Sequence, residues 1–296
     1  MITRRKMITS LAGYTAGSLL LNNAFAMAKK SPHAIGLQLY TLRNEMGKDA
    51  IGTLKKVAEL GYKEVESFGY NGKFFGMDAK TYRETLSGLG LSAPSGHYGY
   101  GNFGNKQIPG TILFGWDKAV EDAAALGQKY MVLAYLQPGE RTSLDDYKKI
   151  AADLNKAGEA CKKAGIQLCY HNHDFEFKEM NGSLPFDILM NQTDSKLVKA
   201  ELDLYWAVKA NQQPLDLFKK YPKRVVLWHV KDMDNTEKKS FTEVGSGTID
   251  FTSIFKAHKE SGMQHLFVEQ DQCPGSPFIS IEKSISYIKG NLIKFV

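Results

Sequence analysis

The sequence predicts a single (β/α)8 barrel of the TIM type, and three observations carry this prediction. Short apolar runs alternate with amphipathic runs from about residue 34 onward. The junction from helix to strand repeats, because a glycine ends the amphipathic run and an apolar run follows at Gly61, Gly90, Gly127, Gly165 and Gly262. Eight strands alternating with eight helices in about 260 residues are what a closed parallel barrel requires.

The elements follow in order along the chain. The first apolar run, 35–39, predicts a strand, and Ile51, Leu54 and Val57 then recur at helical spacing before Gly61. The remaining strands are predicted at 64–68, 91–94, 130–134, 166–171, 198–203, 225–230 and 266–269. Helices are predicted between them at 78–89, 116–126, 143–164, 186–191, 215–221 and 250–261, with a last one beginning at Pro277.

Two of the helix starts have specific end signals. Ser143 and Asp146 have the spacing of a capping box, and Ser276 followed by Pro277 is a cap with proline at the first helical position. A doubly wound open sheet is the alternative fold. It is disfavoured because no G-x-G-x-x-G turn follows the first strand.

Composition is typical of a soluble globular protein with a substantial core. The 296 residues are 43% hydrophobic, 11% aromatic and 24% charged, which excludes disorder, collagen and coiled coil. Length alone leaves one or two domains open, and the barrel pattern favours one domain at 27–296. The three cysteines cannot form a disulfide framework, since at least one stays unpaired, so the fold depends on its core.

Residues 1–26 have the features of an export signal peptide of the twin-arginine type. Arg4 and Arg5 precede a short, weakly apolar stretch, and 24–26 form a small-x-small cleavage signal. We expect cleavage after Ala26 and a periplasmic location. The apolar stretch is too short to span a bilayer, and no other segment predicts a membrane span. An ordinary amphipathic helix is the alternative. Removing this segment lowers the net charge from +6 to +3, so the charge does not suggest a nucleic-acid partner.

Polar side chains gather where the predicted strands end. Parallel barrels place the carboxyl ends of all strands at one face, where active sites form. Interiors avoid such groups unless they are paired or bound to metal, so we expect one shared site. The residues concerned are Gln38, Glu66, His97, His171, His173, Glu176, Glu201, Asp203, His229, Lys231, Glu269 and Asp271.

Four of these residues form a candidate metal site. Glu176, Asp203, His229 and Glu269 supply three carboxylates and one imidazole, a donor set that suits one divalent ion, with Mn²⁺ or Mg²⁺ favoured and Zn²⁺ or Co²⁺ possible. The four residues come from four different strands. The prediction therefore depends on the barrel.

At these residues the chain resembles the sugar phosphate isomerase/epimerase superfamily, the xylose-isomerase-like barrels that also include nucleases of the endonuclease IV type. The resemblance covers nearly all of the chain after the signal. Its most specific segments are YHNHDFEF at 170–177, ELDLYW at 201–206, HVKD at 229–232, EVGSGTID at 243–250 and FVEQD at 267–271.

The resemblance implies one divalent metal held by Glu, Asp, His and Glu from strands five to eight. Asp203, His229 and Glu269 match the last three positions, and Glu176 is assigned to the first, with His173 as the competing ligand. It also implies isomerase or epimerase chemistry through an enediolate, with proton transfer by carboxylates. The expected catalytic residues are Glu176, Glu269 and His173, and the expected substrate-binding residues are Gln38, Glu66, His97, His171, Trp206 and Lys231.

The substrate is expected to be a carbohydrate without phosphate, because no arginine is clustered with a glycine-rich turn. A metal-dependent lyase or eliminase acting on keto-sugar glycosides is the first alternative, since it needs the same metal and base. A non-catalytic exported carbohydrate-binding protein is the second. A nuclease is disfavoured, because Trp206 stands where such an enzyme would offer another ligand and no basic tract is present. The oligomeric state stays open.

Overall fold

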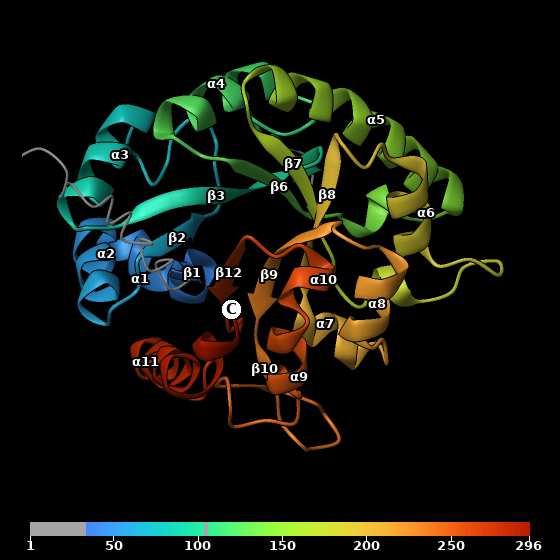
Figure 1. The fold of residues 1–296 in the computed structure, drawn as a ribbon. Helices are drawn as coiled ribbons and strands as arrows, with labels where there is room; N and C mark the ends of the chain where they lie inside the picture. Colours follow the sequence, from blue (N-terminus) through green and yellow to red (C-terminus); the bar gives the residue numbers. More distant parts are fainter. Residues whose placement is uncertain (1–33, 104–105) are drawn as a thin grey trace, which may run out of the picture. The chain divides into compact units, whose positions relative to one another are not determined.

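The computed structural model of the chain describes residues 34–103 and 106–296, so the predicted signal at 1–26 lies outside the described residues. Eight parallel strands close into a barrel in the order β1-β12-β9-β8-β7-β6-β3-β2, which confirms the predicted (β/α)8 architecture. The first strand pairs with the last, and helices lie outside the ring of strands (Figure 1). The barrel strands are β1 (Ile35–Gln38), β2 (Glu64–Ser67), β3 (Ser92–Gly99), β6 (Tyr130–Tyr135), β7 (Gln167–His171), β8 (Val198–Asp203), β9 (Val225–Val230) and β12 (His265–Val268).

The helices follow the predicted alternation. They are α1 (Arg43–Lys48), α2 (Ala50–Glu59), α3 (Ala79–Gly88), α4 (Trp116–Leu126), α5 (Leu144–Lys163), α6 (Pro185–Gln192), α7 (Leu204–Lys209), α8 (Pro214–Lys220), α9 (Phe251–Lys256), α10 (His258–Ser261) and α11 (Pro277–Tyr287). The Ser143 hydroxyl accepts from the backbone of Asp146, and the Asp146 carboxylate accepts from Ser143, so the predicted capping box forms. Among the described helices, none is long and apolar enough to cross a membrane.

The structure differs from the predicted elements at two places that matter for the site. The third strand continues five residues beyond the predicted end at 94, so His97 lies within β3 and pairs with Val132 of β6. An additional helix, α7, begins directly after β8, and the Asp203 side chain caps it by accepting from the Trp206 backbone. Asp203 therefore ends a strand and begins a helix at the same time.

The barrel interior has two layers: a polar layer at the carboxyl ends of the strands and an apolar layer that precedes it along the strands. Side chains two residues apart on a strand face the same side, so each apolar side chain has a polar one above it. Cys169 precedes His171 on β7, Leu227 precedes His229 on β9, and Phe267 lies two residues before Glu269. Cys169, Leu227 and Phe267 form a separate buried cluster with Val132 and Val226. This cluster closes the barrel beneath the polar layer.

A loop after β9 is fixed by one buried carboxylate. Asp232 accepts backbone N–H bonds from Gly245 and Gly247 at 2.9 and 3.0 Å, and from Ile249 at 3.2 Å. The glycine segment of this loop therefore uses these donors internally rather than offering them to an external anion. Asp232 ties the loop to a two-stranded hairpin, β10 (Asp232–Met233) with β11 (Phe241–Thr242), beside the barrel opening.

Candidate metal centre and active site

A layer of ionisable side chains fills the carboxyl end of the barrel. The side chains of Glu66, Glu201, Asp203 and His229 are fully buried, and Glu269 is only 5% exposed. These residues come from β2, β8 and β9 and from the end of β12. Charged groups are buried at such depth only when they are paired or bind a cation, and the contacts described next pair each of these residues.

His229 connects two carboxylates across the barrel. Its Nε2 lies 2.6 Å from Glu66 Oε2, and its Nδ1 lies 2.7 Å from Glu269 Oε2. Glu66 also accepts from the Gln38 amide at 2.7 Å and from the Ser95 hydroxyl at 2.5 Å. The predicted substrate-binding residues Gln38 and Glu66 thus lie in the polar layer, where they bond to each other.

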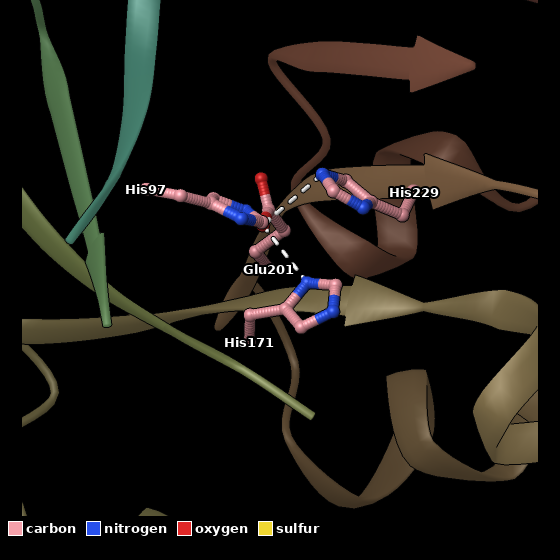
Figure 2. A group of neighbouring side chains, drawn as sticks. All are labelled: His97, His171, Glu201 and His229. Carbon is pink, nitrogen blue, oxygen red and sulfur yellow. Dashed lines mark hydrogen bonds and ion pairs between the residues drawn. The ribbon is translucent and has the colours of Figure 1, made fainter. Parts of the chain in front are cut away.

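Glu201 lies among three imidazoles, as Figure 2 shows. Its Oε2 is 2.7 Å from His97 Nε2, 3.0 Å from His171 Nδ1 and 3.2 Å from His229 Nε2. The barrel register explains this convergence, because His171 pairs with Glu201 across β7 and β8, and Asp203 pairs with His229 across β8 and β9.

Lys231 supplies a buried ammonium at the same end of the barrel. Its Nζ lies 2.9 Å from Asp203 Oδ2, 2.7 Å from Glu269 Oε2 and 2.7 Å from Asp271 Oδ1. The side chain follows β9 directly and is 1% exposed. Lys231 therefore touches Asp203 and Glu269, two of the carboxylates that are predicted to bind the metal.

The electrostatics of the layer are dominated by burial and by these charge pairs. Burial lowers the pKa of His229 and of Lys231, but the neighbouring carboxylates outweigh it and raise both well above their usual values. The same balance raises the pKa of His97 to about 9. Burial raises the pKa of Glu269, yet Lys231 and His229 reverse this and lower it, so the carboxylate is ionised at neutral pH.

Glu176, the predicted first metal ligand, lies outside both candidate ligand groups. Its Oε1 accepts from the Tyr170 hydroxyl at 2.6 Å, and its Oε2 accepts from the His173 backbone at 2.7 Å. Burial raises the pKa of this carboxyl to about 7. The structure instead brings His171 to Asp203, with Nε2 3.7 Å from Oδ2, so the geometry favours His171 as the fourth ligand.

His173 and Trp206 form an aromatic wall at the edge of the site. The His173 ring stacks on Phe175 at 5.3 Å and lies 5.0 Å from Tyr135 and 5.5 Å from Trp206. Burial lowers the pKa of His173 to about 3, so the ring is neutral at pH 7. Its Nδ1 and the Trp206 Nε1 are buried without a hydrogen-bond partner. Both atoms are therefore candidates to bind a substrate hydroxyl.

Two sets of four side chains have ligand atoms within 4.8 Å of one another among the described residues. One set is His171, Asp203, His229 and Glu269, and the other is His97, His171, Glu201 and His229. The buried Asp203 Oδ2 accepts no hydrogen bond in the structure, although Lys231 lies near it. Two carboxylates and two imidazoles are a donor set that fits a divalent cation.

Sequence reasoning noted Glu201 at the strand end but did not assign it a role. The spacing in the sequence indicates its position, because Glu201 and Asp203 are two residues apart and therefore face the same side of β8. Ser95 was also missed. It stands within a run of small residues, and only its pairing with Glu66 across β2 and β3 places it at the site.

Comparisons with known proteins give the same fold. The family model described as "Xylose isomerase-like TIM barrel" matches residues 54–288. A sugar phosphate isomerase/epimerase structure from Parabacteroides distasonis is similar at 30% identity and a TM-score of 0.75, covering 90% of this chain and 96% of that one. An IolI protein solved with a zinc atom is similar at 15% identity and a TM-score of 0.70, covering 89% and 99% of the two chains, which shows the fold alone.

Curated relatives are named inosose dehydratases. The protein from Clostridium perfringens is 31% identical over 164 residues, 49% of this chain and 54% of the relative, so the chain spans about half the length of this relative. The protein from Geobacillus kaustophilus is 25% identical over 270 residues, 79% of this chain and 85% of the relative. The similar proteins thus include both lyases and isomerases.

Proposed function

Because the chain belongs to the xylose isomerase-like TIM barrel family, we propose that it is a metal-dependent enzyme that removes a proton next to the carbonyl of a non-phosphorylated carbohydrate. The observation that carries this proposal is the buried ligand group of His171, Asp203, His229 and Glu269 beside the Lys231 ammonium. This group lies at the carboxyl ends of the strands, where barrels of this type place their chemistry.

The metal proposed for this group is one divalent ion, with Mn²⁺ or Mg²⁺ favoured by the carboxylates and Zn²⁺ or Co²⁺ by the imidazoles. The IolI protein, which shares this fold, was solved with a zinc atom, and this supports a divalent ion as the cofactor. When bound, the ion polarises substrate oxygens and makes the neighbouring C–H bond more acidic. We carry the ligand role to His171 in place of Glu176, because the Glu176 oxygens are bonded to Tyr170 and His173.

Glu269 is the proposed base. It is ionised at neutral pH, and its position after β12 brings the carboxylate to the open end of the barrel. Lys231 lies 2.7 Å from it and donates to the substrate oxygen on which negative charge develops, or returns a proton. The unpaired His173 Nδ1 and Trp206 Nε1 hold hydroxyl groups, while the rings of His173 and Trp206 form the apolar wall for the sugar.

The first candidate outcome is isomerisation or epimerisation, in which the enediolate regains a proton at a carbon. The named function of the similar Parabacteroides distasonis structure supports it. The second candidate is elimination of water or of a glycosidic group from the neighbouring carbon. The dehydratase names of the curated relatives favour it, as does the pairing of one carboxylate base with one ammonium acid at Glu269 and Lys231.

One experiment tests the shared step and separates the outcomes. Metal-loaded protein is incubated in D₂O with a panel of keto-sugars and their glycosides, and products are followed by NMR and mass spectrometry. Deuterium at the carbon next to the carbonyl, lost with Glu269→Gln and after chelation, supports the proposal. A product that differs from the substrate only in its exchanged deuterium and its isomeric form then indicates an isomerase or epimerase. Loss of water or of an aglycone indicates a lyase. Sugar binding that survives both treatments without exchange would replace the proposal with a non-catalytic binding protein.

We also propose that the protein is exported to the periplasm through the twin-arginine signal at 1–26. Export of folded protein would let the barrel acquire its metal before it crosses the membrane. N-terminal sequencing of exported protein tests this, and the expected start is Met27, directly after Ala26. Protein that starts elsewhere or stays in the cytoplasm contradicts the assignment.

A further inference from the structure

Two histidines are shared by the two ligand groups, and each presents a different ring nitrogen to each group. His229 Nδ1 faces Glu269, while its Nε2 faces Glu201 and Glu66. His171 Nε2 lies 3.7 Å from Asp203, while its Nδ1 lies 3.0 Å from Glu201. The two rings therefore separate an outer position, bounded by Asp203 and Glu269, from an inner one bounded by Glu201.

The inner position has a complete set of four donors of its own. His97 Nε2, His171 Nδ1 and His229 Nε2 lie 2.7, 3.0 and 3.2 Å from Glu201 Oε2, and the four ligand atoms lie within 4.8 Å of one another. Figure 2 shows the three rings directed toward this carboxylate. Three imidazoles and one carboxylate form the kind of closed four-ligand set that binds zinc, whereas magnesium prefers oxygen ligands.

The net negative charge at this end of the barrel is large enough to attract more than one divalent ion. Five carboxyl groups converge here, and among the described residues one lysine, Lys231, and no arginine pairs with them. When the imidazoles are neutral, as metal ligation requires, these groups carry four net negative charges. One divalent ion compensates half of this charge, so negative charge remains to attract a second ion. The carboxylates concerned are Glu66, Glu201, Asp203, Glu269 and Asp271.

A buried oxygen without a hydrogen-bond partner also favours a cation at the inner position. Glu201 is fully buried, and its Oε1 accepts no hydrogen bond, although a buried carboxylate oxygen without a partner is costly. A cation bound at Glu201 would compensate this carboxylate. In contrast, the Asp203 and Glu269 carboxylates of the outer position already contact Lys231. The inner position has no such lysine contact among the described residues.

We propose that His97, His171, His229 and Glu201 form a second divalent-cation site, inner to the proposed catalytic one and selective for zinc. The closed ligand set gives this ion a structural or tuning role, because no coordination position remains for substrate. With both positions filled, His171 and His229 would each present one ring nitrogen to each ion and would have to lose the remaining ring proton. Loading the second ion therefore releases protons.

Counting bound zinc tests this proposal without any substrate, so its outcome is independent of the proposed reaction. Metal-free protein is titrated with Zn²⁺ by calorimetry in buffers of different ionisation enthalpy, and tightly bound zinc is then counted by elemental analysis. We expect two zinc ions per chain for the wild type and one for His97→Gln. We expect one for Asp203→Asn as well, with the inner ion retained. The control is His265→Gln, which changes a histidine at the opposite end of β12 and should keep two.

Several results overturn the proposal. One or no zinc in the wild type does so, as does an unchanged count of two in His97→Gln. A wild type with one zinc whose affinity falls in a Glu201→Gln variant would show that Glu201 only orients the imidazole ligands of the outer ion. If His97→Gln does not fold, as judged by circular dichroism, Co²⁺ titration of the wild type decides. A second equivalent with the intense visible bands of a tetrahedral histidine site supports the proposal, and their absence contradicts it.

Discussion

Replacing Glu176 with glutamine should stabilise the protein above pH 7 and leave its stability near pH 4.5 almost unchanged. The Glu176 side chain is fully buried, and burial raises the pKa of its carboxyl from 4.5 to about 7. The folded state therefore favours the protonated form. The cost of ionising this group is absent below pH 4.5, grows as the pH rises, and is complete above about 7.

The difference of about 2.5 pKa units corresponds to about 3 kcal/mol. Glutamine removes the ionisation and keeps the local bonds, since its amide oxygen can accept from the His173 backbone and its amide nitrogen can donate to the Tyr170 hydroxyl oxygen. The variant should therefore gain up to about 3 kcal/mol of unfolding free energy over the wild type at pH 8.

The assay is urea denaturation of wild type and Glu176→Gln at pH 4.5, 6 and 8, compared as differences so that other titrating groups cancel. Glu179→Gln, an exposed carboxyl three residues away, is the matched control and should follow the wild type at every pH. Bound metal is measured on the same samples and should be unchanged in Glu176→Gln. Identical pH profiles for variant and wild type, or a tenfold loss of metal affinity, would refute the reasoning and restore Glu176 as a ligand.

Three further changes test other parts of the structure. Lys231→Met leaves the carboxylates that pair with it buried without their ammonium, so metal-free protein at pH 8 should lose about 3–5 kcal/mol of unfolding free energy in urea. Adding a divalent ion should restore this stability, because the ion compensates the same carboxylates. If stability does not recover, the ion does not bind at these carboxylates. Gly247→Ala places a Cβ against the Met233 carbonyl oxygen and Asp232 Oδ1, so calorimetry should show a loss of about 1–3 kcal/mol of unfolding free energy, whereas Gly290→Ala, with open space around it, should be neutral. Glu269→Gln should reduce deuterium exchange by about 10²–10⁴-fold at unchanged folding, and an exchange rate equal to that of the wild type rules out Glu269 as the base.

The sequence predicted much of the fold because the determinants of each element are local. Glycine at Gly61, Gly127 and Gly262 adopts the positive φ that ends a helix, and the apolar run after each glycine forms the next strand. The strand that contains His97 was predicted too short. Ser95 and Gly96 are not strong strand formers, and their pairing with β2 and β6 overrides this weak propensity.

The sequence by itself determined the barrel and predicted the strand ends at which the structure places a buried layer of ionisable side chains. It also predicted that Asp203, His229, Lys231 and Glu269 lie together, because each stands at or directly after the end of a strand, and the structure places them in one buried layer.

Only the tertiary structure decided how these side chains are grouped. Glu176 and His171 are five residues apart, and sequence spacing did not separate the residue that bonds to Tyr170 from the one that faces Asp203. Glu201 meets His97 across 104 positions of sequence. The physical reason is that barrel closure and strand register set which side chains share a buried layer, and neither quantity is encoded within a single element.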